Sequence, residues 1–121
     1  MANEIKDLSA ILNKLEIENL NKMQVTAISA IPKHSETMLL SPTGSGKTLA
    51  FLLPVVEALN PEIAKIQTLI IVPSRELAIQ IEQVAREMGT GYKVNAFYGG
   101  RSFNKDRIDL KHPPAILIGT P

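Results

Sequence analysis

The sequence lacks cysteine altogether, which excludes disulfide bonds and thiolate metal sites. It also has almost no excess of charge. The formal net charge is +1 at pH 7, so charge alone gives no reason to expect nucleic-acid binding. No apolar run approaches the roughly 20 residues that a membrane-spanning helix needs, and the first six residues do not have the pattern of a secretion signal. These absences predict a cytoplasmic protein with no membrane partner.

The 121 residues suffice for one domain, and with 45% hydrophobic and 21% charged residues the chain can form a core. Hydrophobic periodicity predicts helices and strands in alternation. The helices are expected at 4–16, 22–31, 47–59, 75–88 and 102–110, and the strands at 37–40, 67–72, 92–98 and 115–118. This order predicts an α/β domain with a mainly parallel sheet, made of a helical region 1–35 and an α/β part 36–121. The apolar strand 67–72 is expected to be buried on both faces.

Residues 41–48 read Ser-Pro-Thr-Gly-Ser-Gly-Lys-Thr and lie between an expected strand and an expected helix. The phosphate-loop pattern is Gly, four residues, then Gly-Lys-Ser/Thr. Here Gly46-Lys47-Thr48 fits, and Ser41 replaces the first glycine. A simple turn between strand and helix is the alternative. A turn does not need Lys-Thr directly after two glycines, so the phosphate loop is favoured.

The residue types of this loop suit a nucleotide. Glycines let backbone N–H groups turn inward, where they and the N-terminus of the following helix can hold an anion. Lys47 supplies a mobile positive charge for the outer phosphates, and the hydroxyl of Thr48 suits a magnesium ion that keeps several waters. The predicted nucleotide-binding residues of the loop are Thr43, Gly44, Ser45, Gly46, Lys47 and Thr48, with Lys47 and Thr48 also expected to be catalytic.

Three further stretches follow expected strands. They are Pro73-Ser74-Arg75-Glu76-Leu77-Ala78, Gly99-Gly100 and Gly119-Thr120-Pro121. Each alone could be a strand end, a helix cap or a turn. Open α/β sheets, however, bind ligands at the carboxyl ends of their strands. In this order, and together with the phosphate loop, the stretches resemble the first RecA-like domain of DEAD-box RNA helicases, and the resemblance covers about residues 15–121.

The resemblance implies a P-loop NTPase fold, a RecA-like parallel sheet flanked by helices, of which this chain is the N-terminal part. It implies ATP and Mg²⁺ as cofactors and single-stranded RNA as partner. The residues expected to contact the sugar–phosphate backbone of RNA are Ser74, Arg75, Gly99, Gly100 and Thr120. A hydroxyl, a guanidinium and backbone amides suit phosphate oxygens, and such contacts position RNA without reading its sequence.

Gln24 stands where this family has a glutamine that recognises adenine, and a side-chain amide can pair with both edge groups of adenine. The alternative is a helix cap: Asn21 is a good N-cap, and Gln24 is at the capping-box position. The two roles can coexist. The sequence departs from the family here, because Leu20-Asn21 replaces the usual Pro-Thr and the upstream aromatic residue is absent.

The acidic pair Asp-Glu, which this class needs for ATP hydrolysis, occurs nowhere in the chain. The resemblance therefore implies an ATP-hydrolysing RNA helicase at full length and an inactive isolated chain. In this class the missing strands lie between the phosphate-loop strand and the others, so 37–40 is not expected to neighbour 67–72. Two alternatives remain open: a non-enzymatic nucleotide-dependent nucleic-acid-binding module, and a DNA helicase of the same superfamily.

Overall fold

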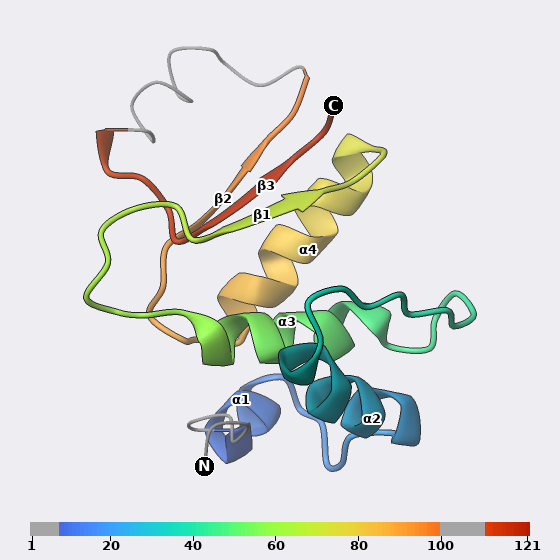
Figure 1. The fold of residues 1–121 in the computed structure, drawn as a ribbon. Coiled ribbons are helices and arrows are strands. Elements are labelled where there is room, and N and C mark those ends of the chain that lie inside the picture. The colour runs from blue at the N-terminus through green and yellow to red at the C-terminus, as the bar shows by residue number, and fades with distance from the viewer. Residues whose placement is uncertain (1–7, 100–110) are drawn as a thin grey trace. The chain divides into compact units, whose positions relative to one another are not determined.

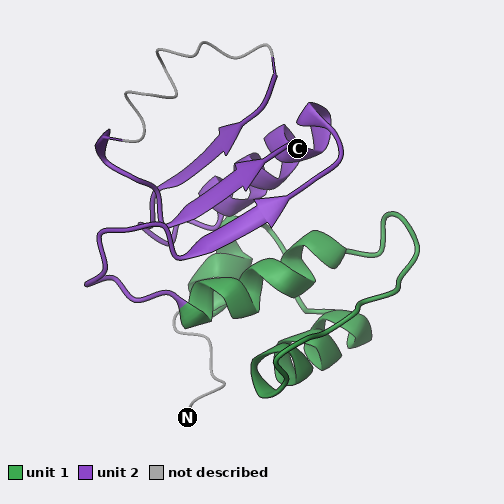
Figure 2. Ribbon diagram, turned by 45° about the horizontal axis from the view of Figure 1, so that its top comes forward, with its two compact units in different colours: residues 1–58 green, residues 59–121 purple. Residues whose placement is uncertain are grey.

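The computed structural model describes residues 8–99 and 111–121. The chain forms two compact units, residues 1–58 and 59–121, which Figure 2 shows in separate colours. The expected helix at 102–110 and Gly100 lie outside the described residues. Within the described ranges, none of the helices has the length and apolar character needed to cross a membrane.

The first unit consists of helices (Figure 1). They are α1 (Leu8–Lys14), α2 (Lys22–Ala30), the short 3₁₀ helix η1 (Ile31–Lys33) and α3 (Lys47–Ala58). Helix α2 packs against α3, and Gln24 and Ala27 of α2 are buried. Helix α3 continues through Pro54, as the apolar residues on both sides of this proline predict.

The N-terminus of α2 carries the expected capping box. The side-chain oxygen of Asn21 accepts a hydrogen bond from the Gln24 amide N–H at 2.9 Å, and the side-chain oxygen of Gln24 accepts one from the Asn21 amide N–H at 2.9 Å. Two N–H groups that the helix cannot satisfy internally are thereby paired. The predicted cap is confirmed.

The predicted strand at 37–40 is wrong. These residues have no regular secondary structure, and Met38 and Leu40 expose 82% and 84% of their surface. The physical reason is pairing: an extended segment becomes a strand only when a neighbour accepts and donates its backbone hydrogen bonds, and no described strand pairs with it. The expectation that 37–40 would not neighbour 67–72 in the sheet agrees with this finding.

The second unit is a three-stranded parallel sheet with one helix. Its elements are β1 (Thr68–Ile71), α4 (Arg75–Glu87), β2 (Val94–Phe97) and β3 (Ile116–Gly119). The spatial order is β1-β3-β2, with Thr68 and Val94 both in register with Ile116. The predicted parallel α/β architecture is confirmed for this unit.

Helix α4 lies along one face of the sheet, as Figure 1 shows. Its apolar positions Ala78, Ile81 and Ala85 are buried, as are Ile116 and Ile118 of β3. The expected burial of β1 on both faces is wrong, because Leu69 and Ile71 expose 59% and 66% of their surface. Since side chains alternate along a strand, these two residues share one face of β1, which α4, the described helix of this unit, leaves uncovered.

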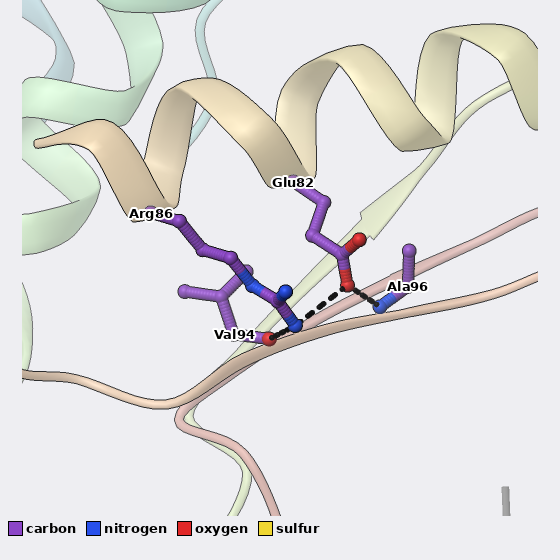
Figure 3. Close-up of polar contacts among 4 residues, drawn as sticks. All are labelled: Glu82, Arg86, Val94 and Ala96. Atoms are coloured by element: carbon purple, nitrogen blue, oxygen red, sulfur yellow. Dashed lines mark hydrogen bonds and ion pairs between the residues drawn. The ribbon is translucent and has the colours of Figure 1, made fainter. Parts of the chain in front are cut away.

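Two side chains of α4 tie the helix to the outer edge of β2 (Figure 3). Glu82 accepts a hydrogen bond from the Ala96 amide N–H at 2.8 Å, and Arg86 donates one to the Val94 carbonyl at 3.1 Å. The carboxylate of Glu82 also forms an ion pair with Arg86 at 3.2 Å. The side chains thus occupy backbone groups that a further strand would otherwise use.

We predict that Glu82→Ala lowers the free energy of unfolding by about 2 kcal/mol, because it removes the mostly buried carboxylate that accepts from the Ala96 amide. Glu82→Gln keeps an acceptor and should cost less, about 1 kcal/mol. Urea denaturation measures both. The control is Gln83→Ala, an exposed neighbour on the same helix, which should change stability by less than about 0.5 kcal/mol. Equal losses for all three variants would contradict the edge contact.

Candidate nucleotide and nucleic-acid site

The loop before α3 begins with a tight turn. The Ser45 amide N–H donates to the Pro42 carbonyl at 3.2 Å, so residues 42–45 form a β-turn. Gly44, the third residue of this turn, has φ +82°, and Gly46 has φ +90°. Both angles lie in the left-handed region that side chains with a Cβ rarely adopt. The backbone therefore requires glycine at both positions of the motif.

Several side chains of the loop form hydrogen bonds within the loop. The Ser45 hydroxyl donates to the Pro42 carbonyl at 2.6 Å, and the hydroxyls of Ser41 and Ser45 are hydrogen-bonded to each other. Because a hydroxyl has one proton, Ser41 must be the donor of that second bond. The ammonium of Lys47 donates to the Ser41 carbonyl at 2.7 Å. The ammonium therefore lies against the loop, and its other N–H groups can donate to further acceptors.

Gln24 reaches the loop from α2. Its side-chain nitrogen donates to the Gly46 carbonyl at 3.2 Å, and the same carbonyl accepts the first hydrogen bond of α3, from the Ala50 amide N–H, also at 3.2 Å. Gln24 is 7% exposed. The structure therefore brings Gln24 and the loop residue Gly46 together, although 22 positions separate them in the chain.

A second contact joins the same two segments. The side-chain nitrogen of Asn21 donates to the Ser45 carbonyl at 2.9 Å. Sequence reasoning identified Asn21 only as a helix cap and did not find this contact. The one available signal is chemical: an Asn side chain carries a donor as well as an acceptor, and the cap uses only the acceptor.

The first turn of α3 contains Lys47 and Thr48. Among the described residues, no three His, Cys, Asp or Glu side chains gather into a metal site. The hydroxyl of Thr48 nevertheless fits a magnesium ion, which is usually held by one or two protein oxygens together with substrate phosphates and waters. The N–H groups at this helix N-terminus fit phosphate oxygens.

The predicted nucleic-acid residues belong to the second unit. Ser74, Gly99 and Thr120 each follow the end of a parallel strand, so they lie at the same edge of the sheet. The Thr120 amide N–H donates to the Phe97 carbonyl at 3.3 Å, which joins the residue after β3 to the last residue of β2. Ser74 is also the N-cap of α4 and accepts from the Leu77 amide N–H at 3.2 Å. Gly100 lies outside the described residues.

Arg75, the first residue of α4, is exposed and pairs with the next residue. Its Nε donates to the Glu76 carboxylate at 3.2 Å. The pKa of Glu76 lies below its usual value, because a backbone N–H of Glu76 and then the Arg75 side chain hydrogen-bond the carboxylate. Glu76 is therefore ionised at neutral pH. Arg75 keeps its two terminal nitrogens, which can donate to a phosphate.

Comparison with known proteins places this geometry in a family. The family model described as DEAD/DEAH box helicase matches residues 21–121. The chain is 32% identical to the DEAD-box ATP-dependent RNA helicase CshC of Bacillus cereus over 97% of its own length, and 36% identical to CshA of Bacillus subtilis over 95%. It spans 32% and 24% of the lengths of these two relatives.

Solved structures agree on the fold. A hypothetical ATP-dependent RNA helicase from Sulfolobus tokodaii superposes with a TM-score of 0.78 over 94% of this chain and 34% of that one, at 24% identity. The helicase Lhr of Mycobacterium smegmatis, solved with single-stranded DNA and AMP-PNP, also gives a TM-score of 0.78, at 28% identity, over 93% of this chain and 17% of that one. The described sheet and helices are thus part of a RecA-like fold.

We predict that Gly46→Ala destabilises the chain more than Gly44→Ala does. Both residues have positive φ, so both variants should cost about 1 kcal/mol from backbone strain. A Cβ at Gly46 would also lie 2.5 Å from the side-chain nitrogen of Gln24, whereas one at Gly44 meets nothing within 4 Å. The additional loss for Gly46→Ala, read from urea denaturation, should be about 1 kcal/mol.

A double-mutant cycle with Gln24→Ala tests the cause of this difference. Without the Gln24 amide, Gly46→Ala should cost no more than Gly44→Ala. An additional loss that persists in the Gln24→Ala background would show that the amide is not what the added methyl group displaces.

Proposed function

Because this chain belongs to the DEAD/DEAH box helicase family, we propose that it is the nucleotide-binding part of an ATP-dependent RNA helicase. The observation that carries the proposal is the loop: two glycines at positive φ lead directly into α3, whose first two residues are Lys47 and Thr48. Backbone N–H groups, an ammonium and a hydroxyl meet there, which is the chemistry that a triphosphate with a magnesium ion requires.

In this proposal the phosphates lie on the loop. The amides of residues 43, 44 and 46–48, which include the N-terminus of α3, would bind phosphate oxygens. The Ser45 amide would join them by releasing its bond to the Pro42 carbonyl. Lys47 replaces or shares its hydrogen bond to the Ser41 carbonyl in order to reach the outer phosphates. Thr48 would hold Mg²⁺, which supplies positive charge against the phosphates when bound.

Gln24 is proposed to recognise adenine without releasing the loop. Its side-chain oxygen already accepts from Asn21, and its nitrogen already donates to Gly46. An amide oxygen has two lone pairs and the nitrogen has two N–H groups. One acceptor and one donor therefore remain, and these match the amino group and a ring nitrogen of adenine.

We place the RNA on the strand-end edge of the second unit. The proposed contacts to the backbone of single-stranded RNA are Ser74, Arg75, Gly99, Gly100 and Thr120. Two observations support the proposal. The described members of this set lie at the same edge of the sheet, and the guanidinium of Arg75 is exposed. A cytoplasmic location belongs to the same proposal.

Residues 1–121 alone are proposed to bind ATP and to hydrolyse none. No Asp-Glu pair occurs in the sequence to complete a magnesium site and position water. ATP turnover by the purified chain that Lys47→Ala abolishes would contradict this part of the proposal.

We predict that Lys47→Ala weakens ATP binding by at least tenfold, because charge-assisted hydrogen bonds to phosphate are among the strong ones. Calorimetric titration of the chain with MgATP measures the change. The matched control is Lys65→Ala, which removes an exposed lysine from the other unit and should leave the affinity unchanged. Equal affinities for wild type and Lys47→Ala would refute the phosphate site.

We predict that Arg75→Ala weakens binding of a single-stranded RNA oligonucleotide and reduces the salt dependence of binding by roughly one ion. Glu76→Gln should have the opposite effect on affinity, because it removes a negative charge beside the guanidinium. Fluorescence anisotropy of the full-length protein with ATP measures both. RNA affinity that neither variant changes would exclude Arg75 from the contact.

The same titration with single-stranded DNA tests a second candidate, a DNA helicase of the same superfamily. The solved Lhr structure, which holds single-stranded DNA and AMP-PNP, is the reason to consider this second candidate. Phosphate contacts without base readout or a contact to the 2′-hydroxyl do not by themselves distinguish the two polymers. Tighter binding of DNA than of RNA would favour the second candidate.

A further inference from the structure

Asn21 uses the two ends of one amide for two different purposes. Its side-chain oxygen accepts from the Gln24 N–H and begins helix α2, while its side-chain nitrogen donates to the Ser45 carbonyl in the phosphate loop. The second bond is 2.9 Å long and spans 24 positions of the sequence. A helix cap does not require it, because any acceptor side chain of suitable length caps a helix.

The bond to Ser45 falls at a sensitive point of the loop. Ser45 lies between the two glycines of positive φ, which have the least conformational restriction of any residues. The carbonyl of the next residue, Gly46, accepts a hydrogen bond from the Gln24 side chain. Two consecutive peptide carbonyls of the loop are therefore fixed by two side chains of one helix N-terminus, and the amides that follow them are fixed in turn.

We infer that Asn21 is a positioning residue of the phosphate site: its amide nitrogen holds the Ser45 carbonyl so that the amides of the loop keep one orientation before a phosphate binds. The inference rests on the proposed function, because it assigns a role in the same phosphate site. Preorganised donors bind an anion more tightly than donors that must first be ordered.

Asn21→Ser separates the two purposes of the side chain. Serine is as good an N-cap as asparagine, but one short hydroxyl cannot keep the cap and also replace the amide nitrogen that reaches Ser45. Asn21→Ala loses both contacts. The control is Asn19→Ser, the same substitution at an exposed position two residues earlier. The ligands are MgATP and magnesium tripolyphosphate, which has no base and therefore reports on the loop alone.

Asn21→Ser is expected to keep the urea denaturation midpoint of the wild type. Its affinity for both ligands should fall about fivefold, the loss typical of one hydrogen bond. Without ligand it should also speed hydrogen exchange at the Ser45 amide, which is bonded to Pro42. Asn21→Ala should lose stability in addition. Asn19→Ser should match the wild type in every measurement.

Several results would overturn the inference. One is wild-type affinity for tripolyphosphate in Asn21→Ser. Another is a loss confined to ATP, which would assign the effect to the base. A third is a loss of affinity that appears only together with a loss of stability, which would make Asn21 a cap alone. A wild-type chain that binds neither ligand would instead refute the proposed function, and this separates the two failures.

Discussion

A single backbone carbonyl, that of Gly46, joins the parts of the first unit on which a phosphate site depends. It accepts the hydrogen bond that begins α3 and a second one from the Gln24 side chain of α2, each at 3.2 Å. Gly46 also has φ +90°, a backbone conformation that residues with a Cβ rarely adopt, so this position requires glycine. The start of α3, the packing of Gln24 and the path of the loop are therefore one arrangement.

The second unit uses helix side chains in a comparable way. Glu82 and Arg86 of α4 bond the amide of Ala96 and the carbonyl of Val94 at the outer edge of β2. This fixes α4 along the strand, and the parallel register fixes the strand ends relative to one another. The strand-end edge, where Ser74 and Thr120 lie, therefore has a defined geometry although the segments on it are loops.

Local chemistry could be predicted from the sequence, and distant pairing could not. The capping box of Asn21 and Gln24 and the parallel α/β order follow from residue type and spacing over a few positions. The strand predicted at 37–40 and the double burial predicted for 67–72 were wrong, because both depend on neighbours that a local apolar run does not specify. The bond from Asn21 to Ser45 escaped prediction for the same reason, since it spans 24 positions.

The missing strand changes which contacts hold the phosphate loop. A phosphate loop is expected to follow a strand whose ladder of hydrogen bonds fixes its first residues. Here residues 37–40 have no such ladder, and Met38 and Leu40 are largely exposed. On the other side, α3 holds the loop from Gly46 onward. Between the two, Asn21 and Gln24 provide the side-chain hydrogen bonds that join the loop to another described element, so α2 performs the anchoring that a paired strand would otherwise share.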